Sequence, residues 1–271
     1  MHTARLPFLR YRPLGELGFL TMLAYRWECF FTALASLLTV GISYYLWSAI
    51  FAGADAGTLP QGFASTFAYV GLSAAILATF NTSAETAISR QIVSGDIIRS
   101  IVRPLDFHCS QISLALGTVA LRSLIGLIPC LTLVMLLLPA GWIEPGNFGL
   151  FALSLIGSFT ILLHIDMLCG LIAVRTEAVW GIRLAKEYVV LICSGALIPI
   201  DWLPPSIAKA LLLLPFQGIC HAPVKLLTAR DLSAPEILSL LGLQLFWAVL
   251  LVVGVRAALR RMLAKIEVHG G

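Results

Sequence analysis

Charged side chains are scarce in this sequence. Asp, Glu, Lys and Arg make up 12% of its 271 residues, whereas hydrophobic residues make up 59%. A soluble domain carries about 25% charged and about 45–50% apolar residues, so this chain has too little polar surface to cover a globule of its size in water. The composition excludes a cytosolic enzyme, a secreted disulfide scaffold and a nucleic-acid-binding protein, and it places most of the chain in lipid.

The common catalytic motifs are also missing. Without a GxxxxGK[ST] phosphate loop, the chain cannot hydrolyse ATP in the Walker manner by itself. It contains no HExxH, GxSxG or paired-carboxylate motif. Its six cysteines lie at least 21 residues apart and form no CxxC pair, which argues against a metal site or a redox pair. We therefore expect a non-enzymatic chain that binds no metal and no cofactor of its own.

Long hydrophobic runs dominate what is present. A spanning helix needs about 20 mostly apolar residues, and five runs meet this length while a sixth is less clean. Because the purely apolar part of the sixth run, 188–200, is too short to cross alone, that span must recruit the turn holding Arg183, Lys186 and Glu187 or stop partway. The sequence predicts an all-α integral membrane protein, a single domain over 1–271, with six transmembrane helices at 30–51, 63–80, 112–138, 148–174, 178–200 and 237–259.

Basic residues alternate between the connecting segments. Fourteen lie before the first span, in the second and fourth loops and after the last span, whereas the opposite loops hold three, namely Lys209, Lys225 and Arg230. By the positive-inside rule, both termini are predicted to lie in the cytoplasm.

Three segments outside the spans are amphipathic or broken. Segment 14–28 has apolar residues at helical spacing, which predicts a helix lying flat at the cytoplasmic interface; a frayed extension of the first span is the alternative. Loop 85–104 places Ile97, Ile98, Ile101 and Val102 on one helical face. Asp96 after Gly95 is suited to cap this helix, and Pro104 ends it. Such a helix suits docking to a soluble partner, or packing on the membrane surface.

The third segment, 201–231, is apolar and lies on the outer side. It is interrupted by several prolines, so its helical pieces are too short to span. We expect re-entrant or interfacial helices there.

Ionisable residues inside the bilayer are costly and mark candidate sites. Arg122 in the third span and Asp166 in the fourth are expected at similar depth, as is His164. We expect Arg122 to pair with Asp166, because neither charge is tolerable alone in lipid. The pair serves either to lock two helices or to act on a substrate or proton. Arg183, Lys186 and Glu187 are expected to extend toward the cytoplasmic headgroups.

A set of aromatic side chains lies near the outer halves of the first two spans. Their π-faces suit a planar hydrophobic cation in a substrate path, and an interfacial aromatic belt explains the same residues more simply. The set comprises Tyr44, Tyr45, Trp47, Phe67 and Tyr69.

Together these features resemble type-2 ATP-binding-cassette (ABC) exporter permeases. Residues 94–105, Ser-Gly-Asp-Ile-Ile-Arg-Ser-Ile-Val-Arg-Pro-Leu, resemble that family's G-D-I…L-x-R-P-L loop, with Ile101-Val102 where a leucine pair is more usual. Residues 194–200, Ser-Gly-Ala-Leu-Ile-Pro-Ile, followed by Leu203-Pro204, resemble its S-G…I-P-L…P segment. Leu214-Pro215-Phe216 and the terminal Gly270-Gly271 also match.

The resemblance implies a permease half without its own motor. It would form a dimer, with itself or with a sister permease, in the inner cell membrane, and would work on two copies of a cytoplasmic ATPase that binds ATP and Mg. The path at the dimer interface, lined by spans one, two and five, would export a drug, organic cation, lipid or glycan. Docking to the ATPase would fall to Gly95, Asp96, Ile97, Arg99, Arg103 and Pro104.

Two other functions stay open from the sequence. A stand-alone secondary transporter would need acidic residues at the bilayer midplane and internal repeats, and the sequence offers only the off-centre Asp166 and no repeat. An intramembrane enzyme acting on lipids would need clustered His, Asp or Glu, and the five histidines are scattered.

Overall fold

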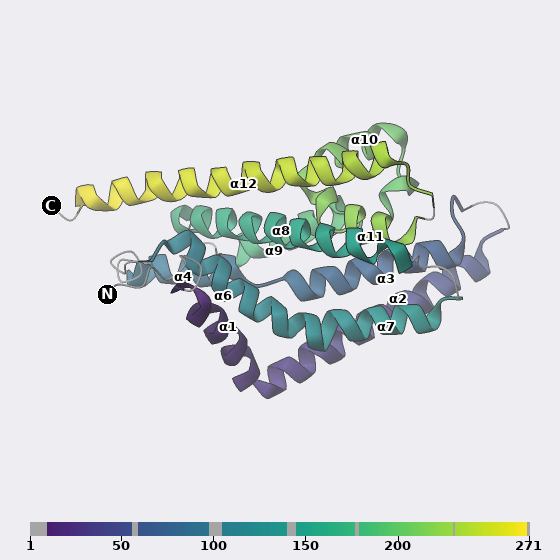
Figure 1. Cartoon of the computed structure of the whole chain (residues 1–271), viewed down its shortest axis with the longest axis horizontal. Helices are drawn as coiled ribbons and strands as arrows, with labels where there is room; N and C mark the ends of the chain where they lie inside the picture. The colour runs from purple at the N-terminus through teal and green to yellow at the C-terminus, as the bar shows by residue number, and fades with distance from the viewer. Residues whose placement is uncertain are drawn as a thin grey trace.

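A computed structural model describes residues 10–55, 59–97, 105–139, 145–176, 179–229 and 231–269, with backbone alone for 173–176 and 263–269. Within these ranges every regular element is helical. The longest helices run side by side along the long axis of the molecule, whereas α1 lies oblique to it (Figure 1). The α-helices are α1 (Arg12–Ala24), α2 (Arg26–Gly53), α3 (Phe63–Phe80), α4 (Ala84–Val93), α6 (Phe107–Arg122), α7 (Ile128–Leu137), α8 (Phe148–Thr176), α9 (Val179–Cys193), α10 (Pro205–Leu213), α11 (His221–Thr228) and α12 (Ala234–His269).

Five helical stretches are long and apolar enough to cross a membrane. They correspond to five of the six predicted spans, although several extend further than the hydrophobic runs suggest. Their bounds are Arg26–Gly53, Phe63–Val93, Phe107–Leu137, Phe148–Ile172 and Ala234–Met262. The all-helical membrane architecture predicted from the sequence is confirmed.

The expected fifth span, 178–200, is shorter than predicted. Its helix, α9, includes Arg183, Lys186 and Glu187 but ends at Cys193. At 1.5 Å per residue, its 15 residues reach about 22 Å, which is less than the roughly 30 Å of a bilayer core. The chain then turns at Gly195, whose φ of +79° suits glycine. Helix α9 thus recruits the charged turn, as one of the two arrangements requires, and still ends before it reaches the length of a span.

The predicted flat helix at 14–28 is divided by a break. Helix α1 ends at Ala24, Tyr25 leaves the helical conformation with ψ 64°, and 26–28 begin α2. The two helices meet in a V (Figure 1), so α1 is not a straight extension of the first span. One face of α1 packs against α6 at glycines: a Cβ on Gly117 would lie 1.8 Å from the carbonyl oxygen of Gly15.

Between α6 and α7 the chain forms one π-helical turn, Ser123–Leu127. Pro129, at the start of α7, has no N–H to donate and its ring crowds the carbonyl four residues earlier. The wider turn accommodates this proline while the helix continues.

Helix α3 forms the centre of the molecule. Twelve of its 18 residues are buried, and Phe67, Leu72 and Ile76 are completely enclosed. In the outer segment 201–231, the chain forms the short helices predicted there. The last of them, α11, has six of its eight residues buried and packs between α3 and α8. The later part of the outer segment, 215–228, is therefore part of the protein core, whereas α10 has no buried residue.

Candidate functional site

A buried ion cluster joins three helices at one end of the bundle. Asp166 of α8 is 0% exposed and Lys186 of α9 is 8% exposed. The Nζ of Lys186 donates to Oδ1 of Asp166 at 2.8 Å. The same Nζ lies 3.4 Å from Oε2 of Glu85 on α4, a residue that is itself 1% exposed. One ammonium therefore bridges two buried carboxylates from different helices.

The cluster extends toward the surface through α9. The Nε of Arg183 donates to Oε1 of Glu187 at 2.9 Å and lies 3.7 Å from Oε1 of Glu85. Asn81, at the end of α3, donates from Nδ2 to the same Glu187 oxygen at 3.4 Å. The cluster thus balances three carboxylates with two cations, and neither oxygen of Glu85 accepts a hydrogen bond. Within the cluster, Glu85 lies at ion-pair distance from both Lys186 and Arg183.

The expected pairing of Arg122 with Asp166 is wrong in this structure. Arg122 donates from Nη1 to the backbone carbonyl of Asn81, and the acidic residue acting on its charge is Glu28 of α2. Lys186 occupies the position next to Asp166, because α9 packs against α8 there. Lys186 accordingly does not extend to the headgroups as predicted. Sequence reasoning missed Glu85 altogether, and its only signal was an acidic residue directly after the second apolar run.

The backbone around Ser83 brings Glu85 into the cluster. Asn81 is extended and Ser83 has φ 54°, a left-handed conformation uncommon for residues other than glycine. This bend directs α4 onto α8. A Cβ on Gly170 would lie 3.0 Å from the backbone of Glu85, and Ser89 Oγ donates to the Gly170 carbonyl at 3.0 Å. Since Gly170 lies one turn after Asp166, the close approach places the two carboxylates side by side.

The predicted docking residues begin where α4 ends. Gly95 has φ +75° with open space around its Cα, and Ser94 Oγ donates to Oδ2 of Asp96 at 2.9 Å. Ile97 is buried. Residues 94–97, which we call the α4 turn, are therefore exposed at Ser94 and Gly95 and return to the bundle at Ile97. Three further predicted docking residues, Arg99, Arg103 and Pro104, lie outside the described residues.

The aromatic set does not share one open surface. Trp47, Phe67 and Tyr69 are buried, and Tyr44 is half-buried against Phe67 with ring centroids 5.1 Å apart. The phenol of Tyr69 forms a hydrogen bond of 2.9 Å with Nδ1 of His221. Only Tyr45 of the set is largely exposed, at 73%. In the protomer these rings are mainly core, which fits neither a cation path nor a lipid-facing belt.

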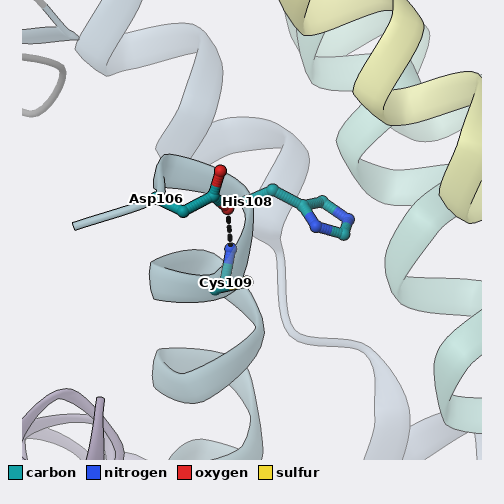
Figure 2. A group of neighbouring side chains, drawn as sticks. All are labelled: Asp106, His108 and Cys109. Carbon is teal, nitrogen blue, oxygen red and sulfur yellow. Dashed lines mark hydrogen bonds between the residues drawn. The ribbon is translucent and has the colours of Figure 1, made fainter. Parts of the chain in front are cut away.

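Near the start of α6, Asp106, His108 and Cys109 bring a carboxylate, an imidazole and a thiol within 4.8 Å of one another. Oδ1 of Asp106 accepts from the backbone N–H of Cys109 at 2.8 Å and so caps the helix. Figure 2 shows the His108 ring directed away from both other side chains, where its Nε2 lies 2.9 Å from Nε2 of His164. A cap and a histidine pair account for these residues without a metal ion.

The charge state of Asp106 follows from these neighbours. Partial burial acts to raise the pKa of this carboxyl, but hydrogen bonding to Cys109, with smaller contributions from the charges of neighbouring residues, outweighs it, so that the pKa lies below its ordinary value of 3.8. Asp106 is therefore ionised at neutral pH and caps α6 as a carboxylate.

Comparison with known proteins gives one family. The family model described as ABC-2 family transporter protein matches residues 62–270, which include α3 to α12 and the whole ion cluster. A search of curated proteins gives no match.

Proposed function

Because this chain belongs to the ABC-2 family of transporter proteins and is a multi-pass permease, we propose that it forms half of an ATP-driven exporter. The second half is another permease, identical or a sister chain. Energy comes from two copies of a separate ATPase that hold ATP and Mg. We place the chain in the inner membrane with both termini in the cytoplasm, and α9 and the outer segment together complete the fifth of six crossings.

The α4 turn is the proposed contact with the ATPase. It lies at the end of a ten-residue helix, about 15 Å long, whose other end carries Glu85. A displacement of the turn therefore moves Glu85 as part of the same rigid helix. Glu85 faces Lys186 of α9, and Lys186 in turn is bonded to Asp166 of α8. This continuous connection from the turn to α9 is the observation that carries the proposal.

The ion cluster couples α4 to α9 through charge. Glu85 lies within ion-pair distance of both Lys186 and Arg183 of α9, so a displacement of α4 acts on α9 through two contacts. The Lys186–Asp166 bond, at 2.8 Å, holds α9 to α8 during such a movement. We propose that closure of the ATPase shifts α4 and that α9 follows, opening the substrate path alternately to either side of the membrane.

The path itself is proposed to lie between the two permease copies. Helices α2 and α9 carry large exposed aromatic side chains, among them Tyr45, Trp180 and Tyr188. Such surfaces suit a hydrophobic or amphiphilic substrate, and a drug, an organic cation, a lipid or a glycan belongs to that class.

One observation favours a second candidate, the stand-alone secondary transporter. Glu85 and Asp166 are two buried acidic residues next to one lysine, and buried carboxylates are the usual proton or cation sites of ion-coupled transporters. The absence of an internal repeat in the sequence still counts against it.

Isolation of the tagged chain in mild detergent from its native membrane, followed by mass spectrometry, distinguishes the exporter from the secondary transporter. The exporter proposal expects a co-purified soluble protein with a Walker motif. Recovery of this chain alone, with transport driven by an ion gradient and insensitive to ATP, contradicts it and favours the secondary transporter.

A further inference from the structure

A pocket lies apart from the ion cluster, between the start of α6 and the C-terminal part of α12. Its volume is about 520 Å³. Two arginines of α12, Arg256 and Arg260, line one side, and the first turn of α6 lines another. Apolar side chains complete the wall, namely Ile97, Leu105, Leu259 and Met262. The lining of the pocket thus combines two basic side chains with several apolar ones.

The pocket lies at the depth of lipid headgroups. The predicted spans nearest to it cover 112–138 and 237–259, and the charged lining residues Asp106 and Arg260 lie just outside the ends of these apolar runs. The pocket is therefore expected where the apolar core of the bilayer gives way to the polar interface. A ligand there meets acyl chains on one side and water on the other.

The charges of the pocket favour an anion. Arg256 and Arg260 are one helical turn apart and exposed. Within the described side chains, neither has a carboxylate at ion-pair distance. Asp106 is the one acidic residue of the lining, and one of its oxygens is already occupied by the Cys109 N–H. The two guanidinium groups of the lining therefore exceed its one carboxylate.

We propose that this pocket binds the phosphate of an anionic phospholipid. Guanidinium groups bind phosphate oxygens with paired hydrogen bonds, and basic pockets between helices at the cytoplasmic face bind anionic headgroups. The apolar side chains would contact the glycerol and the upper acyl chains, which free phosphate lacks. The volume accommodates a headgroup rather than a whole lipid. The site is independent of the proposed ATPase partnership.

Native mass spectrometry of the full-length chain, purified with whatever subunits accompany it, tests the site. The protein is titrated with phosphatidylglycerol, and with phosphatidylcholine of the same acyl chains as the zwitterionic comparison. The variants are Arg256→Gln, Arg260→Gln, the double variant and the charge-preserving Arg256→Lys. Arg261→Gln is the matched control, since Arg261 is exposed on the same helix but does not line the pocket.

The proposal expects phosphatidylglycerol to bind more tightly than phosphatidylcholine. Each single glutamine variant should weaken that binding about fivefold and the double variant about 25-fold, whereas Arg261→Gln leaves it unchanged and Arg256→Lys retains most of it. Millimolar inorganic phosphate should not displace the lipid. Each substitution is on an exposed side chain, so folded protein is expected throughout.

Three results would overturn the proposed phospholipid site. Equal weakening by Arg261→Gln shows diffuse attraction between charges rather than a site. Saturation by inorganic phosphate without phosphatidylglycerol binding shows a free-anion site. Loss of a co-purified soluble subunit in the double variant, with lipid binding intact, assigns the arginines to a protein contact instead.

Discussion

The ammonium of Lys186 lies 2.8 Å from a carboxylate oxygen of Asp166, and both side chains are buried. This bond joins α8 to α9, and the same ammonium holds Glu85 of α4 at 3.4 Å. A buried charge that loses its partner is costly, whereas an apolar replacement of the whole pair is often tolerated. Single substitutions in the cluster should therefore destabilise the protein more than double substitutions that remove both charges of a pair.

Lys186→Met leaves two buried carboxylates without their ammonium. We expect the single variant to lose about 3–5 kcal/mol of stability, and Lys186→Met combined with Asp166→Asn to recover a large part of it. The thermal unfolding midpoint in detergent measures this coupling. If instead exchanging Arg122 and Asp166 rescues an unstable Asp166→Arg variant, the pairing described here is contradicted.

Glu85→Gln removes the charge that links α4 to α9 while preserving the shape of the side chain. We expect ATPase binding and ATP hydrolysis to persist, because the α4 turn is unchanged. The ATP-dependent change in distance between spin labels at Tyr188 of the two permease copies should be lost. Glu16→Gln, on an exposed residue of α1 paired with Arg12, serves as the control and should keep that change. A normal distance change in Glu85→Gln would exclude Glu85 from transmission.

Gly117→Ala tests the contact between α1 and α6. The new Cβ would lie 1.8 Å from the Gly15 carbonyl oxygen, so the two backbones must separate. We expect a loss of about 1–3 kcal/mol, the usual cost of overpacking. Gly41→Ala is the matched control, because a Cβ there meets nothing within 4 Å and alanine favours a helix by about 1 kcal/mol. Equal midpoints for the two variants would contradict the close packing.

Gln244→Leu tests how α12 is held to the bundle. The side-chain amide of Gln244 donates to the Gly218 carbonyl at 2.7 Å and to the Ser154 carbonyl at 2.8 Å. Leucine would leave these buried carbonyls without that donor, at a cost of about 1–3 kcal/mol. Leu245→Ala, on the neighbouring exposed residue, should change the unfolding midpoint much less, and the reverse order would refute the anchoring role.

Hydrophobic runs predicted five of the spans because each is long, continuous and nearly free of charge. The same reasoning misjudged α9, since an apolar run reports composition and not the turn at Gly195 that ends the helix after Cys193. It also joined 14–28 into one helix, because nothing in the residue pattern marks the break at Tyr25.

The partners in the ion cluster could not be predicted from the sequence for a related reason. Two charges inside long apolar runs, Arg122 and Asp166, suggested a pair, while Lys186 appeared only as part of a polar turn. Which side chains meet depends on the left-handed Ser83 and on the close contact at Gly170. Both features arise when the chain packs, and the residue types Ser and Gly alone do not predict them.

Cysteine crosslinking from position 96 tests directly whether the α4 turn binds the ATPase. Asp96→Cys, introduced into a chain whose native cysteines are replaced, is paired with single cysteines across the surface of the co-purified ATPase. If the turn docks there, we expect a crosslink confined to one cleft of the ATPase, with a yield that changes on adding ATP. Full-length, folded complex that gives no crosslink from this position, while one forms from the exposed Lys209 of the outer segment, would contradict both the docking site and the orientation.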